Sequence, residues 1–228
     1  MHRIEAIEDR SGMRNLIATL LLSLAGSALA QGVPVPGNTG NCLNTEEAAL
    51  VQAVNAYRVQ NGRAALPASY WLSTTGQWHG WDLQANAPVG GNCNLHSWSA
   101  AMPNLWQAVC YTPDHLQASQ MWGKPRQISQ GTLPQGSPLF YSGNGYENAA
   151  VAGGIMTANI ALTAWQNSPA HREVILQQGV WAGVNFRGLG VGIVGNYAVL
   201  WFGDGTDPAG TMPECTGASP AIYNNGFE

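Results

Sequence analysis

Residues 190–202 read GVGIVGNYAVLWF, and this stretch decides the class of fold. Two short runs rich in β-branched and aromatic residues, 190–194 and 197–202, flank the dipeptide Gly195-Asn196. A glycine next to an asparagine between two such runs is typical of a tight hairpin turn. The stretch therefore predicts an antiparallel hairpin late in the chain. The run 184–186 has a similar composition, and we expect a strand there as well.

The first structured segments predict helices. Asn44 is a good capping residue, it is followed by carboxylates, and apolar residues recur at helical spacing until Asn61-Gly62 ends the run. A second helix is predicted over 69–83. Gly76 in its interior lowers helix stability by about 1 kcal/mol relative to alanine, so we expect close packing of a neighbour against it.

Between these helices and the hairpin the sequence predicts a long loop and further helices. Residues 86–145 form a long loop rich in proline, glycine, serine and aromatic residues, which is more often functional than idle. Further helices are predicted over 115–122, 160–167 and 172–178, with Ser168-Pro169 as the cap and first residue of the last one. Helices first, then a long loop, more helices and a hairpin predict an α+β layered domain.

The N-terminus carries an export pattern. Residues 16–25 form an unbroken apolar and small run, preceded by Arg14 and followed by Ala28-Leu29-Ala30. This order predicts a secretory signal peptide over 1–30. The apolar run, about ten residues long, is too short for a membrane-spanning helix. We therefore expect a secreted protein, either extracellular or periplasmic.

The composition excludes two classes of protein. Hydrophobic residues make up 45% of the chain, charged residues only 10%, and the net charge is -4. Such a chain has too little charge and too much apolar surface for an intrinsically disordered protein. It also lacks the basic character of nucleic-acid-binding proteins, so no nucleic acid is expected as a partner.

The chain has four cysteines, and an even number in an exported protein predicts disulfides. Three pairings are possible. We favour Cys93 with Cys110, which closes the long loop, and Cys42 with Cys215, which ties the start of the domain to its end. A cysteine zinc site is disfavoured because the sequence contains no C-x-x-C pair.

Three later segments carry metal-capable or proton-transferring groups, namely His96-Ser97-Trp98, Tyr146-Glu147-Asn148 and the stretch 165–172, WQNSPAHR. Their order resembles the CAP superfamily of cysteine-rich secretory, antigen 5 and class 1 pathogenesis-related proteins, also called the SCP domain, and in particular its bacterial secreted members. The resemblance implies a three-layer α-β-α sandwich with a small antiparallel sheet, a long irregular loop and an open cleft. The predicted organisation is a linker over 31–43, the CAP/SCP-like domain over 44–203 and an irregular tail over 204–228.

The resemblance also implies a site. Family members carry two histidines and two acidic residues in the cleft, and His96, Glu147 and His171 match three of these four positions. Ser168 occupies the position of the fourth residue, which is acidic in the family. Tyr146 replaces the glycine that precedes the family's glutamate. Two imidazoles from distant segments suit a borderline divalent cation such as Zn²⁺. Glu147 would orient one imidazole or accept a proton.

The function expected on this basis is binding of a divalent cation through His96 and His171, and of an extended or apolar ligand. The cleft is expected to include Glu147, Asn148, Ser168 and Trp98. An alternative remains equally open, in which these polar residues form a hydrogen-bonded cluster that only holds the loops in place. His79 is expected to pack between aromatic residues and His115 to lie in a loop, neither as a ligand.

Two alternative functions remain. The first is a hydrolase acting on peptide or cell-wall material, with Glu147 as the candidate catalytic residue, although no G-x-S-x-G or H-E-x-x-H motif is present. The second is a carbohydrate-binding module that uses the loop tryptophans Trp98, Trp106 and Trp122.

Overall fold

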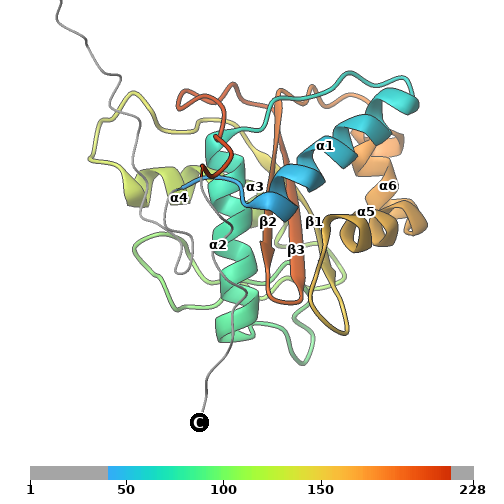
Figure 1. Ribbon diagram of the computed structural model, residues 1–228. Helices are drawn as coiled ribbons and strands as arrows, with labels where there is room; N and C mark the ends of the chain where they lie inside the picture. The colour runs from blue at the N-terminus through green and yellow to red at the C-terminus, as the bar shows by residue number, and fades with distance from the viewer. Residues whose placement is uncertain (1–40, 217–228) are drawn as a thin grey trace, which may run out of the picture.

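The computed structural model describes residues 41–216 (Figure 1). The predicted signal peptide, residues 31–40 of the predicted linker and the last twelve residues lie outside this range. Three strands, β1 (Gly145–Val151), β2 (Gly188–Val194) and β3 (Tyr197–Gly203), form an antiparallel sheet in the order β1-β3-β2. The predicted hairpin is confirmed as β2 and β3, and Gly195 in its turn has the positive φ of 58° that favours glycine.

The strand expected over 184–186 is absent. The Val184 carbonyl instead accepts a hydrogen bond of 2.7 Å from the side chain of Gln177. Phe186 is buried and stacks on Phe202 of β3, with ring centroids 4.8 Å apart. The β-type composition of this run therefore reflects burial beside the sheet, and the ladder starts only at β2.

Helices precede and surround the sheet. They are α1 (Thr45–Gln60), α2 (Tyr70–Asn86), α3 (Ala118–Trp122), α4 (Lys124–Thr132), α5 (Ala158–Asn167), α6 (Pro169–Ile175) and the 3-10 turn η1 (Gly179–Trp181). Asn44 caps α1 in a capping box with Glu47, and Ser69 caps α2, as the sequence predicts. The sequence missed α4. It correctly predicted Ser168 as the cap and Pro169 as the first residue of α6, but it placed the end of that helix three residues too late.

Both faces of the sheet are covered, which makes the domain an α+β three-layer sandwich (Figure 1). Leu200 and Trp201 point to opposite faces of β3, and both are fully buried. α2 packs directly against β2, because a Cβ on Gly76 would lie 2.8 Å from the backbone of Val191. On the other face the guanidinium of Arg58 in α1 lies 5.6 Å from the ring centre of Phe202. The close packing predicted at Gly76 is confirmed.

Both favoured disulfides are formed, Cys42 with Cys215 and Cys93 with Cys110. The first is flanked by backbone hydrogen bonds, in which Leu43 N–H donates to the Pro213 carbonyl and Cys215 N–H donates to the Leu43 carbonyl. The described part of the tail is therefore fixed to the start of the domain. None of the helices within residues 41–216 has both the length and the apolar character needed to cross a membrane.

Candidate functional site

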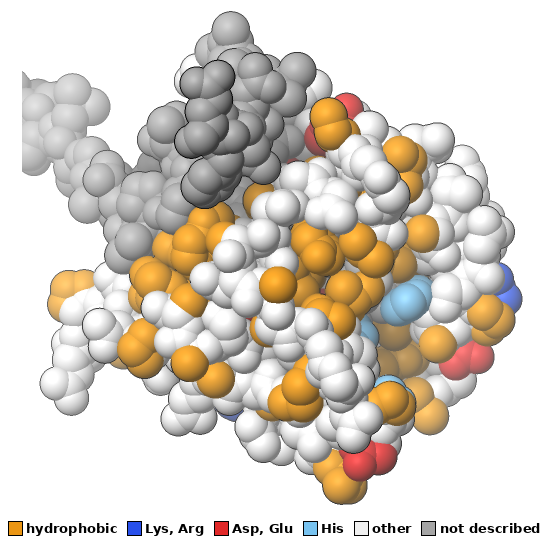
Figure 2. All heavy atoms as spheres, turned by 90° about the horizontal axis from the view of Figure 1, so that it is seen from below, with side chains coloured by type: hydrophobic (Ala, Val, Ile, Leu, Met, Phe, Trp, Pro, Cys, Tyr) orange, Lys and Arg blue, Asp and Glu red, His pale blue; other side chains and the backbone are white. Residues whose placement is uncertain are grey.

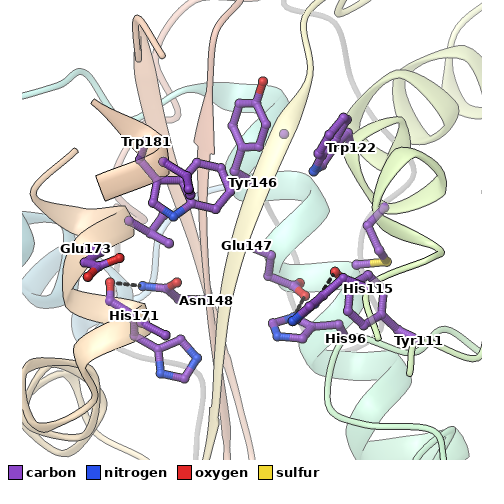
Figure 3. A pocket seen from close by; sticks show the side chains of 15 residues that line it. His96, Tyr111, His115, Trp122, Tyr146, Glu147, Asn148, His171, Glu173 and Trp181 are labelled. Atoms are coloured by element: carbon purple, nitrogen blue, oxygen red, sulfur yellow. Dashed lines mark hydrogen bonds and ion pairs between the residues drawn. The ribbon is translucent and has the colours of Figure 1, made fainter. Parts of the chain in front are cut away.

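A pocket of about 350 Å³ lies at the edge strand β1, and its residues come from both faces of the sheet (Figure 3). Successive side chains of a strand point to opposite faces. Glu147 accordingly reaches toward His96 on one side of β1, while Asn148 lies on the other side and donates a hydrogen bond of 3.0 Å to the backbone carbonyl of His171 (Figure 3). The pocket thus wraps around one strand.

Glu147 is the centre of the polar cluster. Its Oε1 lies 2.5 Å from Nδ1 of His79, and its Oε2 lies 2.7 Å from Nδ1 of His96. The side chain is only 3% exposed. Burial raises the pKa of this carboxyl, but the charge and hydrogen bond of His79, followed by those of His96, lower it to about 2. The carboxylate is therefore ionised, and both of its oxygens are used by imidazoles.

The role of His79 in this cluster was not predicted from the sequence. The residue lies in α2, is fully buried and stacks on Trp98 with ring centroids 4.2 Å apart, so the expected aromatic packing is confirmed. Its role as partner of Glu147 was not anticipated. The signal available in the sequence was a histidine on the core face of a helix, since buried polar groups need hydrogen-bond partners. That partner is 68 residues away and could not be identified from spacing.

His96 is held from one side and open on the other. The Glu147 carboxylate can only accept, so Nδ1 of His96 carries the proton of this 2.7 Å hydrogen bond. In the neutral ring Nε2 is then left with a free lone pair. The side chain is 24% exposed and lines the pocket. An imidazole fixed in this way by a carboxylate is the usual arrangement of a metal-binding histidine.

His171 lines the same pocket from α6 (Figure 3). Burial lowers the pKa of its imidazole, the charge that His96 would carry when protonated lowers it further, and Glu147 partly opposes this. These effects favour the neutral ring, which is the form that binds metals. Within residues 41–216 no group of three or more histidine, cysteine, aspartate or glutamate side chains is arranged to hold a metal. A cation here would have two imidazole ligands, His96 and His171, one protein ligand fewer than catalytic zinc sites have, with water in its other positions.

Two residues expected in the cleft are elsewhere. Trp98 is 2% exposed and lies behind the pocket, where it supports His79. Ser168 stands at the N-cap of α6, but its side chain makes no capping hydrogen bond. Its backbone carbonyl accepts from Arg172 N–H, which is the ordinary first hydrogen bond of the helix. Neither residue lines the pocket.

Aromatic residues form much of the remaining wall. Trp122, Tyr146 and Trp181 line the pocket, and the Tyr146 ring lies edge-on to both tryptophans. Trp122 is 38% exposed, as expected for a rim residue, whereas Trp106 is buried and cannot contact a ligand. Figure 2 shows histidine side chains around a hollow that is bordered by apolar side chains.

His115 also lines the pocket, from the loop in which the sequence placed it. Its Nδ1 lies 3.0 Å from the hydroxyl of Tyr111. The Tyr111 ring also lies edge-on to His96, with centroids 5.3 Å apart. Tyr111 therefore contacts both imidazoles.

No family model matches the sequence, and no curated protein matches it. Solved structures with a similar arrangement include an extracellular SCP-domain protein from Bacillus anthracis, with 16% identity, a TM-score of 0.44 and 69% of this chain covered. A cysteine-rich secretory protein from Staphylococcus aureus has 15% identity, a TM-score of 0.40 and 70% coverage. An outer surface protein from Borrelia burgdorferi has 15% identity, a TM-score of 0.43, 70% coverage of this chain and 92% of its own. The match spans only 39% and 38% of the first two proteins.

Proposed function

We propose that this chain is an exported domain whose pocket binds one divalent cation, best suited to Zn²⁺, through His96 and His171. The observation that carries the proposal is the contact of 2.7 Å between His96 Nδ1 and Glu147 Oε2. It fixes the tautomer in which Nε2 of His96 has its lone pair free on the pocket side. His171 supplies a second neutral imidazole in the same pocket.

When bound, the cation would act as a Lewis acid that holds and polarises one group of the ligand. The chain's own residues do the positioning: Glu147 orients His96, and Asn148 holds the backbone of His171 by a hydrogen bond of 3.0 Å. Trp122, Tyr146 and Trp181 offer an apolar wall beside these imidazoles. The pocket volume of about 350 Å³ is at the small end of the range for small-molecule sites. We infer that the ligand has a polar end at the histidines and an apolar or extended portion on this wall.

Export is part of the proposal. Two disulfides are formed, and disulfides persist in oxidising compartments outside the cytoplasm. The apolar run that precedes Ala30 supplies the signal that such export needs. The domain would therefore meet its cation and ligand in the periplasm or outside the cell.

The contacts of Glu147 favour binding over hydrolysis. A general base needs a free oxygen within reach of its substrate. Both Glu147 oxygens accept from imidazoles, and the side chain is 3% exposed. Its carboxylate is therefore better suited to orient His96 than to remove a proton from a bound molecule.

Calorimetric titration of the metal-free protein with zinc at pH 7.5 tests the proposal. The wild type should bind close to one zinc per chain, and the double variant His96→Ala/His171→Ala should bind none. His115→Ala is the matched control: it also removes an imidazole of the pocket wall, but not one of the two proposed ligands, and it should retain zinc. Equal binding by the wild type and a folded double variant would refute the site.

A further inference from the structure

Both ring nitrogens of His79 face oxygen atoms. Nε2 lies 3.0 Å from the backbone carbonyl of Ser97, and Nδ1 lies 2.5 Å from Oε1 of Glu147. A carbonyl oxygen can only accept a hydrogen bond, so Nε2 must carry a proton. This contact alone is satisfied by a neutral imidazole.

The contact at Nδ1 requires a second proton. An ionised carboxylate is an acceptor only, and an unprotonated Nδ1 would set one lone pair against another at 2.5 Å. One proton must therefore lie between Nδ1 and Oε1. His79 and Glu147 together hold one proton more than a neutral histidine and an ionised glutamate would.

The surroundings favour His79 as the holder of this proton. Oε2 of the same carboxylate already accepts from His96, which stabilises the ionised form of Glu147. The His79 ring lies flat against Trp98, with an interplanar angle of 7°, and an aromatic face attracts a cation. A buried charge is tolerated when it is paired and hydrogen-bonded, and both nitrogens of His79 meet this condition.

We propose that His79 is a buried imidazolium that balances the charge of Glu147 and fixes that carboxylate for His96. It is thus a positioning residue behind the proposed cation site, and this part of the inference rests on the proposed function. With Glu147 balanced, the cluster offers the pocket imidazole lone pairs without net negative charge. Imidazole suits zinc, copper and nickel, whereas calcium and magnesium depend on anionic oxygen ligands. His79 would therefore set the preference of the site for borderline cations.

Nitrogen NMR on the metal-free full chain tests the protonation state directly. Two-bond proton–nitrogen correlations of the imidazole rings distinguish a doubly protonated ring from a neutral tautomer. The chain has five histidines, and single glutamine variants of His2, His96, His115 and His171 assign their signals, leaving those of His79 by elimination. At pH 7 His79 should show two protonated nitrogens, and the pattern of a neutral ring would overturn the inference.

The protonation state of His79 is measured without zinc, so the failure of this inference and the failure of the proposed function are distinguishable. The selectivity claim is tested with His79→Gln, whose amide can donate to Glu147 but carries no charge. Calorimetry with zinc and with calcium should show the ratio of their affinities fall by about tenfold or more in this variant, because the carboxylate has lost the positive charge in direct contact with it and attracts hard cations more strongly. An unchanged ratio in the folded variant would contradict the role in selectivity. If His79→Gln does not fold, the wild-type spectrum still decides the protonation state.

Discussion

A Cβ atom on Gly192 of β2 would lie 2.2 Å from the carbonyl carbon of Gly76 in α2. The helix and the strand are therefore in direct backbone contact, without side chains between them. Gly190 makes a similar contact one pleat earlier, where a Cβ would lie 2.1 Å from the backbone of Leu72. This close approach sets the distance between α2 and the sheet. Because His79 lies on α2, the same packing brings its imidazole within hydrogen-bond distance of Glu147.

Gly192→Ala should destabilise the fold severely. The added methyl would collide with backbone atoms, which cannot rotate away as a flexible side chain can. Overpacking usually costs about 1–3 kcal/mol, and we expect the loss here to reach at least the top of that range. Urea unfolding at pH 7.5 measures it, with Gly154→Ala as the matched control, since a Cβ on Gly154 would meet nothing within 4 Å. Equal unfolding midpoints for the two variants would disagree with the described contact.

Glu147→Gln should weaken zinc binding. A carboxamide has one acceptor oxygen, so its NH₂ group would face one of the two imidazole N–H groups that the carboxylate now accepts from. Loss of such an orienting partner typically lowers metal affinity about 10- to 100-fold. Calorimetric titration measures the change. Glu173→Gln, which alters an exposed carboxylate of the same pocket, should leave the affinity within about threefold of wild type. Similar affinities for both variants would remove the orienting role from Glu147.

The Cys93–Cys110 disulfide should matter for the site as well as for stability. It fixes the segment that carries His96. The same segment is also held to the other end of the loop by reciprocal backbone hydrogen bonds between Trp98 and Val109. On the loop-entropy model, replacing both cysteines by serine costs about 3 kcal/mol. We expect weaker zinc binding in addition, because His96 gains freedom.

The Cys42–Cys215 bridge supplies the matched control for that prediction. It closes a longer loop, so its removal should cost more stability, about 5 kcal/mol on the same model. Neither of its cysteines lines the pocket, and zinc affinity should remain unchanged under conditions where the variant is folded. Zinc affinities that fall equally in both double variants would show that the shorter bridge has no particular role at the site.

Glu47 should make the domain less stable as the pH rises from 4.5 to 7. It is 1% exposed, and burial raises its pKa to about 7, although hydrogen bonds from Asn44, Ile193 and Gln77 oppose this. A raised folded pKa favours the protonated form in the native state. Its stabilising contribution is therefore complete below the unfolded pKa of 4.5 and is lost as the pH passes the folded value. The loss is of the order of 3 kcal/mol.

Comparison with Glu47→Gln isolates this effect from other groups, such as His171, whose lowered pKa acts in the opposite direction. The free energy of unfolding of each protein is measured by urea titration at pH 5 and at pH 7.5. The wild type should lose stability relative to the variant between these values. A difference between the two proteins that does not change with pH would refute the prediction.

Local signals in the sequence predicted the starts of helices and the hairpin well. Asn44 and Ser69 are caps whose hydrogen bonds lie within three residues, so the sequence contains both partners. The strand β1 was missed because it is an edge strand whose pairing partner β3 lies about fifty residues further along the chain. The helix α4 was missed because its residues, KPRQISQGT, are mostly polar and include proline and glycine.

The candidate site was predicted only as far as the family resemblance reached. The resemblance selected His96, Glu147 and His171, and all three line one pocket. It gave no reason to pair His79 with Glu147, because that contact depends on how deeply α2 packs on the sheet. The expectation for Trp98 failed for a related reason: a tryptophan in an irregular loop is stacked on the buried His79 instead of facing solvent.

Crystals grown with zinc, with diffraction data collected on both sides of the zinc absorption edge, test the central claim most directly. The account predicts one strong anomalous peak in the pocket, within bonding distance of Nε2 of His96 and of a ring nitrogen of His171, about 2.0–2.1 Å from each. A zinc ion bound elsewhere on the domain, or a pocket without an anomalous peak at saturating zinc, would contradict it.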